Sequence, residues 1–193
     1  MGIDILVLDR FLEPGECQRI IAEVTASASN EAGVYGGRKA VDPVVRKALV
    51  AAVSQDTLDT VSDSLAQALP VFSKHFGVHI TSFEPPQFLH YRTGDYFVAH
   101  QDGNTPLIQD ETLGRKVSVS IFLNPQTEPA TVGTYSGGSL VLHGSYPDWE
   151  YRKDVTSPPG TLVAFRSETT HEVLPVSAGE RFAIVAWFRS QTI

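Results

Sequence analysis

The sequence has little cysteine, no basic stretch and no long apolar run. Its single cysteine, Cys17, cannot form an internal disulfide, which fits a reducing compartment. Its 15 lysines and arginines are scattered among 22 acidic residues, and the net charge of −7 argues against nucleic-acid binding. No apolar run approaches the length of a membrane span, and the opening MGIDILVLDRF lacks the features of a signal peptide and the myristoylation pattern. We therefore expect a soluble, cytoplasmic protein that binds neither nucleic acid nor membrane.

The composition that remains is that of an ordinary globular domain. Apolar residues make up 42% of the 193 residues and charged residues 19%, a mixture typical of a folded chain. This length suits one well-filled core better than two. We expect a single domain over 1–193, with a helical N-terminal support region over 1–77 and a strand-rich region over 78–193.

Apolar periodicity predicts two helices in the first part of the chain. After Pro14, apolar residues recur with helical spacing at Cys17, Ile20, Ile21 and Val24. A second helical stripe begins near Asp56 and should end at Gly77, with Pro70 expected to kink the helix.

Short strands separated by turn residues follow Gly77. Besides 3–8, the candidates are 87–92, 96–102, 116–123, 138–143, 150–155, 161–166, 171–176 and 181–189, with turns such as TGD, NPQ, SGG, SPPG and SAGE. This pattern predicts a mainly β protein with flanking helices, built as a double-sheet jelly roll or a barrel. The two helices should pack on one outer face of a sheet.

A histidine and an aspartate lie two residues apart in the stretch HYRTGDYFVAHQDG. Because side chains alternate along a strand, His100 and Asp102 should point to the same face. This pair alone is a weak signal, since most such pairs are surface residues. His171 opens the strand HEVLPV after the turn SETT, and a jelly-roll hairpin would bring it toward His100 and Asp102. The remaining histidines, His75, His79, His90 and His143, are interpreted as structural or solvated.

These three side chains together match the two-histidine, one-carboxylate set that binds Fe(II) in non-haem oxygenases. Three protein ligands leave three of six coordination positions open. A bidentate 2-oxo acid can take two of these positions and O₂ the third.

Arg181 opens the final apolar strand, RFAIVAWF. Burying an arginine without a partner costs several kcal/mol, so this side chain requires an anion. The partner is either an internal carboxylate or an anionic ligand held bidentately.

Four segments resemble the prolyl 4-hydroxylase-like branch of the Fe(II)- and 2-oxoglutarate-dependent dioxygenases. They are DRFLEPGECQRII, the spaced pattern from Tyr91 to Asp102, GRKVSVSIFLN with the following YSGGSLVL, and HEVLPVSAGERFAIVAWF. The four occur in the family's order and cover most of the chain. The resemblance implies a double-stranded β-helix, a cupin-like jelly roll.

The resemblance also implies roles for individual residues. His100, Asp102 and His171 would be the catalytic iron ligands, and Arg181 would bind the distal carboxylate of 2-oxoglutarate. Tyr91 matches an active-site tyrosine that hydrogen-bonds this cosubstrate or lines the pocket. Phe122 stands where hypoxia-type prolyl hydroxylases have a tyrosine hydroxyl, so the second partner of that carboxylate is open. Ser118, Ser120 and Thr161 are the candidates. Trp187 matches an aromatic residue near the substrate, and a plain core role is equally compatible with its position.

The function implied by this resemblance is hydroxylation of an unactivated C–H bond. It would require Fe(II), 2-oxoglutarate and O₂, would release succinate and CO₂, and leaves ascorbate open as a further cofactor. A prolyl residue in a peptide or protein is the first candidate substrate, and a free amino acid or other small metabolite is the alternative. A zinc hydrolase and a non-catalytic metal-binding jelly roll remain as rival classes.

The glycine-rich segment from Asn30 to Asp42 is expected to be a mobile loop, with Gly33, Gly36 and Gly37 in it. In related hydroxylases the corresponding region closes over the substrate. We therefore expect this segment to act as a lid over the iron site, and an ordinary surface connection between the two helices is the alternative.

Overall fold

The computed structural model describes residues 2–27, 29–31, 44–103, 105, 111–145 and 150–190. In the N-terminal part the elements are β1 (Ile5–Leu8), α1 (Pro14–Ala26), β2 (Ser29–Glu31), β3 (Arg46–Lys47), β4 (Leu49–Ala51) and α2 (Gln55–Phe76). Next come β5 (Ser82–Phe83), β6 (Gln87–Tyr91), β7 (Tyr96–His100), the short 3₁₀ helix η1 (Glu111–Gly114) and β8 (Arg115–Phe122). The last elements are β9 (Tyr135–Gly137), β10 (Leu140–His143), β11 (Arg152–Val155), β12 (Leu162–Arg166), β13 (His171–Val173), β14 (Val176–Gly179) and β15 (Arg181–Arg189).

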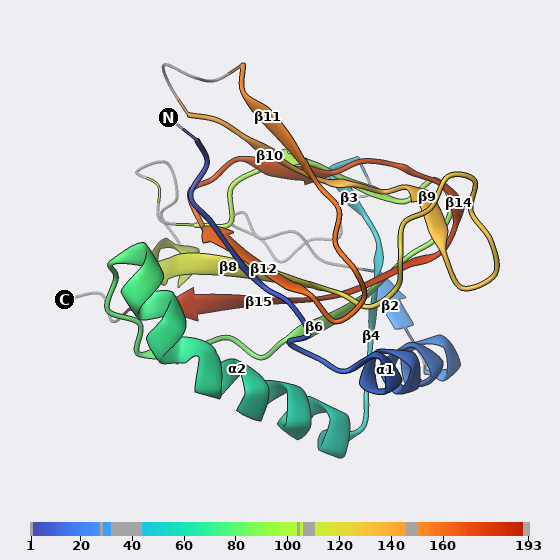
Figure 1. The fold of residues 1–193 in the computed structure, drawn as a ribbon, viewed down its shortest axis with the longest axis horizontal. Helices are drawn as coiled ribbons and strands as arrows, with labels where there is room; N and C mark the ends of the chain where they lie inside the picture. The colour runs from blue at the N-terminus through green and yellow to red at the C-terminus, as the bar shows by residue number, and fades with distance from the viewer. Residues whose placement is uncertain are drawn as a thin grey trace.

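Two antiparallel sheets face each other and form the jelly roll that the strand pattern predicted. The larger sheet has the order β1-β12-β8-β15-β6-β4-β2, with β5 also paired to β15. The smaller sheet has the order β11-β10-β13-β7-β3, and a separate ribbon pairs β14 with β9. In Figure 1, β10 and β11 lie on the side of β8, β12 and β15 opposite to α2.

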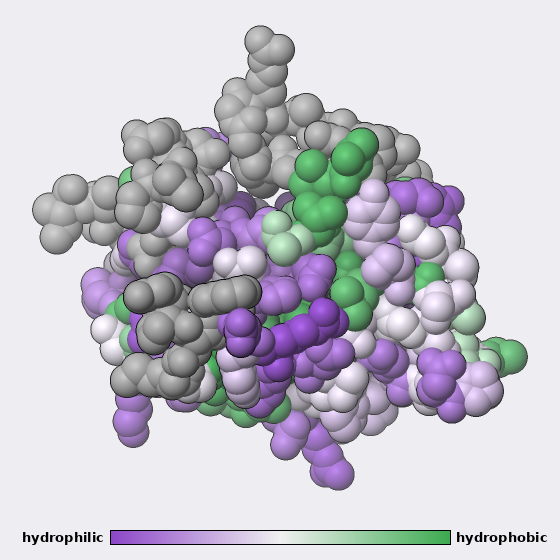
Figure 2. All heavy atoms as spheres, turned by 90° about the horizontal axis from the view of Figure 1, so that it is seen from above, coloured by the Kyte–Doolittle hydropathy of each residue, from purple (hydrophilic) through white to green (hydrophobic). Residues whose placement is uncertain are grey.

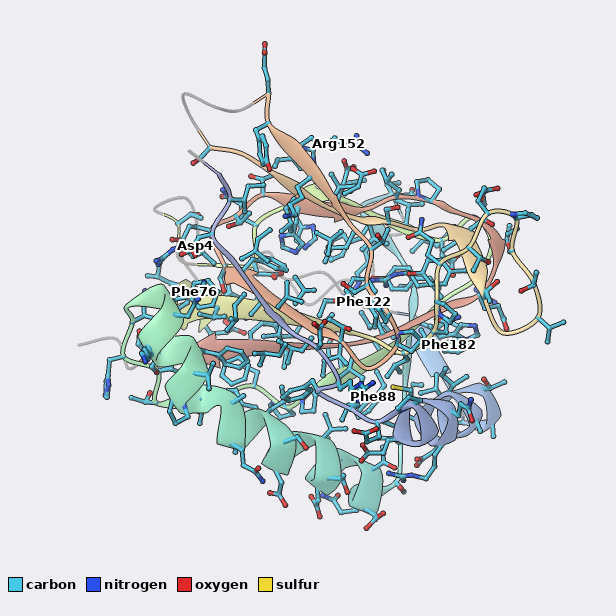
Figure 3. The ribbon with its side chains drawn as sticks, in the orientation of Figure 1. Asp4, Phe76, Phe88, Phe122, Arg152 and Phe182 are labelled. Atoms are coloured by element: carbon cyan, nitrogen blue, oxygen red, sulfur yellow. The ribbon has the colours of Figure 1, made fainter. Side chains whose placement is uncertain are left out.

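Side-chain alternation divides the larger sheet into a helix-facing surface and an interior surface. From β8, Val117, Val119 and Ile121 join the cluster that also contains the buried residues of α1 and α2. Phe122 instead joins a second cluster between the two sheets, with Leu142 of β10. Phe122 is labelled in Figure 3 in this interior, well above the helices. Both helices therefore cover one outer face of the larger sheet, as predicted.

Local signals at the ends of α2 agree with the sequence. The Ser54 side chain accepts a hydrogen bond from the main-chain N–H of Thr57, a normal N-cap. Gly77 ends the helix with φ of 63°, a left-handed conformation that glycine adopts without a Cβ penalty. The helix continues past Pro70 to Phe76.

Several predicted boundaries differ from the structure. The predicted strand 171–176 is two strands, because the chain passes from β13 to β14 at Pro175, which has no N–H to donate. β14 then pairs with β9 instead of β10. The predicted strand over 3–8 is present as β1, which pairs with β12, whereas β4, which pairs with β6, was not predicted.

The predicted loop from Asn30 to Asp42 lies mostly outside the described residues, so the lid hypothesis stays a prediction. Its first two residues, Asn30 and Glu31, belong to β2, which pairs with β4.

The surface shows mixed polarity. Figure 2 shows one face on which hydrophilic side chains are widespread and apolar ones form a strip. The large exposed apolar side chains are scattered over the fold: Val7, Val44, Val71, Val98, Leu113, Val132 and Tyr151. Within the described ranges, neither helix combines the length and apolar character needed to cross a bilayer.

Candidate functional site

Three potential metal ligands meet at one end of two adjacent inner strands of the smaller sheet. His100 is the last residue of β7, His171 is the first residue of β13, and the two are register partners in the ladder. Asp102 follows two residues after His100, and its oxygens lie 3.5 Å from Nε2 of His100 and 3.3 Å from Nε2 of His171. One ligand atom from each residue falls within 4.8 Å of the others. The fold thus brings together the three residues that the sequence predicted as one set.

Both histidine rings are oriented so that Nε2 faces the centre. Nδ1 of His100 lies 2.8 Å from the main-chain oxygen of Val98, and Nδ1 of His171 lies 2.9 Å from that of Thr169. A carbonyl oxygen can only accept, so each Nδ1 carries the proton and donates it. Each Nε2 then keeps a free lone pair, which is the usual state of a metal-binding histidine.

Burial and charge keep these groups in their metal-binding protonation states. Burial lowers the pKa of His171 to about 4, with the neighbouring His100 acting in the same direction and Asp102 against it. For Asp102, burial would raise the pKa, but the neighbouring His171 and His100 and the hydrogen bond from Ser118 outweigh it, and the pKa lies well below its usual range. Near neutral pH the centre therefore has neutral His171 and an ionised carboxylate.

Arg181 lies in the same interior, at the start of β15. Only 2% of its surface is exposed, and its guanidinium lies 5.0 Å from the ring centroid of Tyr91 and 5.6 Å from that of Phe122. Among the described residues, no salt-bridge partner lies within 4.0 Å of Arg181, and its Nε has no hydrogen-bond partner. The described residues therefore do not supply the internal carboxylate that was one of the two predicted partners of Arg181.

One pocket joins the metal-binding residues to Arg181. It encloses about 450 Å³ of empty space, counting the part open to solvent. Its lining includes His100, Asp102, His171, Arg181, Tyr91, Ser120 and Trp187.

The three hydroxyl candidates occupy different environments. Ser120 lines the pocket, and its buried Oγ has no hydrogen-bond partner among the described residues. Oγ of Ser118 lies 3.0 Å from Oγ of Ser167, and Ser118 also hydrogen-bonds Asp102. Thr161 is buried just before β12. Neither Ser118 nor Thr161 belongs to the pocket lining found in the described part of the chain, so their predicted cofactor-binding role stays a prediction.

Arg46 is a pocket residue that the sequence analysis did not single out. It lies on β3 beside β7, and its guanidinium is 4.8 Å from the ring centroid of Phe97, which stacks on His100 at 3.5 Å. A signal was present in the sequence, because the Arg46-Lys47 pair interrupts the apolar stretch of 44–52. Only the pairing of β3 with β7 places this arginine at the pocket.

Three other histidines pair with carboxylates away from the centre. Their Nε2 atoms lie 3.0–3.1 Å from a carboxylate oxygen in the pairs His75–Asp4, His90–Glu180 and His143–Glu172. These contacts agree with the structural interpretation of these residues.

The residues present fit an iron ion and a 2-oxo acid. Two imidazole nitrogens and one carboxylate form the donor set of the Fe(II) facial triad. The unpartnered Nε of Arg181 and Oγ of Ser120 are two buried polar groups of the same pocket, and a carboxylate is a suitable partner for either.

Comparison with known proteins agrees with this geometry. The model of the 2OG-Fe(II) oxygenase superfamily matches residues 86–189, more than half of the chain and all of the metal-binding residues. The chain belongs to the 2OG-Fe(II) oxygenase superfamily. Among curated relatives, it is 33% identical over 108 residues to a PKHD-type hydroxylase of Shewanella sp. (strain MR-7) and 34% identical over 107 residues to one of Stenotrophomonas maltophilia (strain R551-3).

These matches cover 56% and 55% of this oxygenase-family chain, and 44% and 43% of the two relatives. The chain therefore aligns with less than half the length of these relatives.

Solved structures confirm the double-stranded β-helix. A prolyl-4-hydroxylase of Pseudomonas putida superimposes with a TM-score of 0.75 at 22% identity, covering 99% of this chain and 95% of that one. A prolyl hydroxylase from Trichoplax adhaerens, in complex with a peptide fragment of a hypoxia-inducible factor, gives a TM-score of 0.72 at 19% identity. That alignment covers 97% of this chain and 84% of the other.

Proposed function

We propose that this oxygenase-family chain is an Fe(II)- and 2-oxoglutarate-dependent dioxygenase that hydroxylates an unactivated C–H bond and releases succinate and CO₂. The observation that carries the proposal is a buried arginine in the pocket of the metal-binding residues. Arg181 has no carboxylate within salt-bridge distance among the described residues. A dicarboxylic 2-oxo acid supplies the missing anion at one end and a metal-chelating group at the other.

The protein's own groups prepare the site for this chemistry. Neutral His171 and ionised Asp102 are ready to bind the cation without first exchanging protons. Arg181 and Ser120 hold the distal carboxylate, and the rings of Tyr91 and Phe122 enclose the guanidinium. Bound iron would supply the activation of O₂.

Ser120 is the proposed second partner of the distal carboxylate. Of the three hydroxyl candidates, it alone combines a pocket position with a buried, unpartnered Oγ among the described residues. Ser120 and Arg181 lie on neighbouring strands, since β8 pairs with β15.

A prolyl residue in a peptide or protein is the proposed substrate class. Curated relatives carry the name PKHD-type hydroxylase, and two structural neighbours are prolyl hydroxylases, one of them bound to a peptide. The pocket also has Trp187 and Arg46 in its lining, which provide an aromatic wall and a positive charge for substrate contacts. A free amino acid or another small metabolite remains the second candidate.

The test is turnover by the full chain, purified without oxygen. The protein is supplied with Fe(II), 2-oxoglutarate and O₂, together with proline-containing peptides or with free amino acids. Succinate formation and a mass increase of one oxygen atom in the substrate are measured. We expect both with a peptide and neither in His171→Ala, because that variant loses one of three metal ligands.

Other outcomes separate the alternatives. Oxygen insertion into a free amino acid alone would transfer the proposal to metabolites. If the protein bound no 2-oxoglutarate and instead hydrolysed substrates with Zn²⁺, the dioxygenase proposal would be wrong. Metal binding without any turnover across the substrate panel would favour a binding module.

A further inference from the structure

A buried arginine lies directly behind the metal-binding carboxylate. Arg115, the first residue of β8, is 3% exposed. Its Nη1 donates to the main-chain oxygen of Asp102 at 3.3 Å, and its guanidinium lies 4.0 Å from the ring centroid of Trp187. Arg115 thus contacts a metal-binding residue and a pocket-wall residue at the same time.

Glu84 and Arg189 hold this arginine in one orientation. Nε and Nη2 of Arg115 donate to the two carboxylate oxygens of Glu84 at 2.8 and 2.6 Å. Arg189 donates to the same carboxylate at 2.9 Å, and the N–H of Glu84 donates to the main-chain oxygen of Trp187 at 2.9 Å. Bidentate pairing fixes the plane of a guanidinium. We refer to Glu84, Arg115 and Arg189 as the Arg115 cluster.

The main chain at Asp102 is held between this cluster and β12. The N–H of Asp102 donates to the main-chain oxygen of Ser167 at 2.9 Å, while the carbonyl of Asp102 accepts from Arg115. The next residue, Gly103, has no space for a side chain, because a Cβ there would lie 2.1 Å from the main-chain oxygen of Thr112. The direction of the Asp102 carboxylate therefore depends on contacts made by its backbone.

We propose that Arg115 is a positioning residue, which orients Asp102 toward the two histidines and supports the Trp187 face of the pocket. This inference rests on the proposed metal site. An ordinary internal salt bridge would contribute to folding alone. A positioning role predicts in addition a loss of metal affinity, since residues that support metal ligands typically change that affinity by about 10–100-fold.

The test measures Mn²⁺ binding, because Mn²⁺ takes the same kinds of ligand without oxidising during the experiment. Calorimetric titration of the full chain gives the dissociation constant, and thermal unfolding of the metal-free protein gives its stability. We expect Arg115→Gln to weaken Mn²⁺ binding by about tenfold or more. Arg115→Lys keeps the charge but loses the bidentate pairing, so it should restore part of the affinity.

Arg166 provides a matched control. It also pairs with a carboxylate, contacts a main-chain oxygen and lies over an aromatic ring: its Nε is 3.0 Å from Asp4, its Nη2 is 2.8 Å from the oxygen of Phe76, and its guanidinium is 5.6 Å from the Phe76 ring centroid. Asp4 and Phe76 are labelled near each other in Figure 3, at the C-terminal end of α2. Arg166→Gln should lower stability and leave Mn²⁺ affinity unchanged.

A second measurement follows the Trp187 contact. In a Trp149→Phe background, Trp187 is the only tryptophan of the chain. Removing the cation over its ring should shift the emission of Trp187 in Arg115→Gln and leave it unchanged in Arg166→Gln.

A substitution at a more exposed residue of the cluster tests the inference even if Arg115→Gln does not fold. Arg189 is 29% exposed and, among the described residues, makes no hydrogen bond to Asp102 or Trp187. Arg189→Gln should therefore fold and show a smaller loss in the same direction. Wild-type Mn²⁺ affinity in every folded variant of the cluster would overturn the inference and leave the proposed function intact. A wild-type protein that bound no Mn²⁺ or Fe(II) would instead overturn both.

Discussion

Arg181 and Ser120 present two buried polar groups to one pocket from neighbouring strands. The contributions of the two side chains to ligand binding differ, and experiments can measure each one separately. The guanidinium contributes charge and geometry, whereas the hydroxyl contributes one hydrogen bond. Both should act on the distal carboxylate of the 2-oxo acid and leave its metal-chelating end unaffected.

Arg181→Ala should weaken 2-oxoglutarate binding to the Mn²⁺-loaded protein by about 2–5 kcal/mol, the usual cost of truncating a buried charge pair. Calorimetry gives the dissociation constant. Pyruvate, a 2-oxo acid without the distal carboxylate, serves as the control ligand and should bind the variant and the wild type alike. An unchanged affinity for 2-oxoglutarate would mean that Arg181 has a purely structural role.

Ser120→Ala should weaken 2-oxoglutarate binding by about tenfold or more, because a hydrogen bond to a charged group contributes about 1.5–3 kcal/mol. The metal-free variant should be as stable as the wild type, since the lost hydroxyl has no hydrogen-bond partner in the described structure. Ser118→Ala is the matched control. Its hydroxyl bonds Asp102, so that substitution should affect metal binding more than binding of the acid. The reverse pattern would assign the carboxylate contact to Ser118.

At the scale of elements, the helices support the sheet that carries half of the pocket. Phe72 of α2 is fully buried and packs edge-on against Phe188 of β15, with ring centroids 4.7 Å apart. Arg181 and Trp187 project from the opposite face of the same strand into the pocket. Helix packing therefore contributes to stability on one face of β15, and ligand chemistry occurs on the other.

Phe72→Ala should destabilise the protein by about 3–5 kcal/mol, as expected for a large side chain removed from a core. Urea unfolding at 25 °C measures this. The neighbouring Val71 is 44% exposed, so Val71→Ala should change stability by no more than about 0.5 kcal/mol. Folded Phe72→Ala should keep wild-type Mn²⁺ affinity. Equal effects of the two substitutions would contradict the assigned packing of α2.

At the scale of the whole molecule, the reactivity of the Cys17 thiol shows whether the chain is folded. Burial raises the pKa of its thiol to about 11, with the charge of Glu16 acting in the same direction. The native thiol should therefore stay protonated and react slowly with iodoacetamide at pH 8, because the thiolate is the nucleophile. Labelling should accelerate only when denaturant unfolds the chain. Rapid labelling of the native protein would contradict the burial of α1 against the sheet.

The same shift predicts a pH dependence of stability. The unfolded thiol ionises near pH 9, whereas the folded thiol stays protonated until about pH 11. The contribution of Cys17 is thus fully present below about pH 9 and is lost as the pH rises toward 11. Cys17→Ala removes this contribution, so the free energy of unfolding should fall less steeply between these pH values than in the wild type. If the free energy of unfolding fell equally steeply with pH in Cys17→Ala and in the wild type, the thiol would have the same pKa in the folded and unfolded states.

The sequence by itself determined the features that depend on local periodicity. Alternation along a strand predicted that His100 and Asp102 share a face, although β7 ends at His100 and Asp102 follows it outside the strand. Helical spacing identified α1 and the buried stripe of α2. Turn residues marked most of the later strands, although the break at Pro175 and the short strands β2, β3, β4, β5 and β9 were missed. The short strands have too few residues for a periodic pattern, and they form because distant strands pair with them.

Only the tertiary structure decided which of these residues meet. The ladder between β7 and β13 sets His171 beside His100, and the pairing of β3 with β7 adds Arg46 to the pocket. Ser118 and Ser120 have the same chemistry and point to the same side of β8, yet Ser118 has a hydrogen-bond partner and Ser120 has none in the described structure. That difference, and the contact of Arg115 with Asp102, arise from long-range packing, because hydrogen-bond partners distant in sequence are chosen by the fold and not by local spacing.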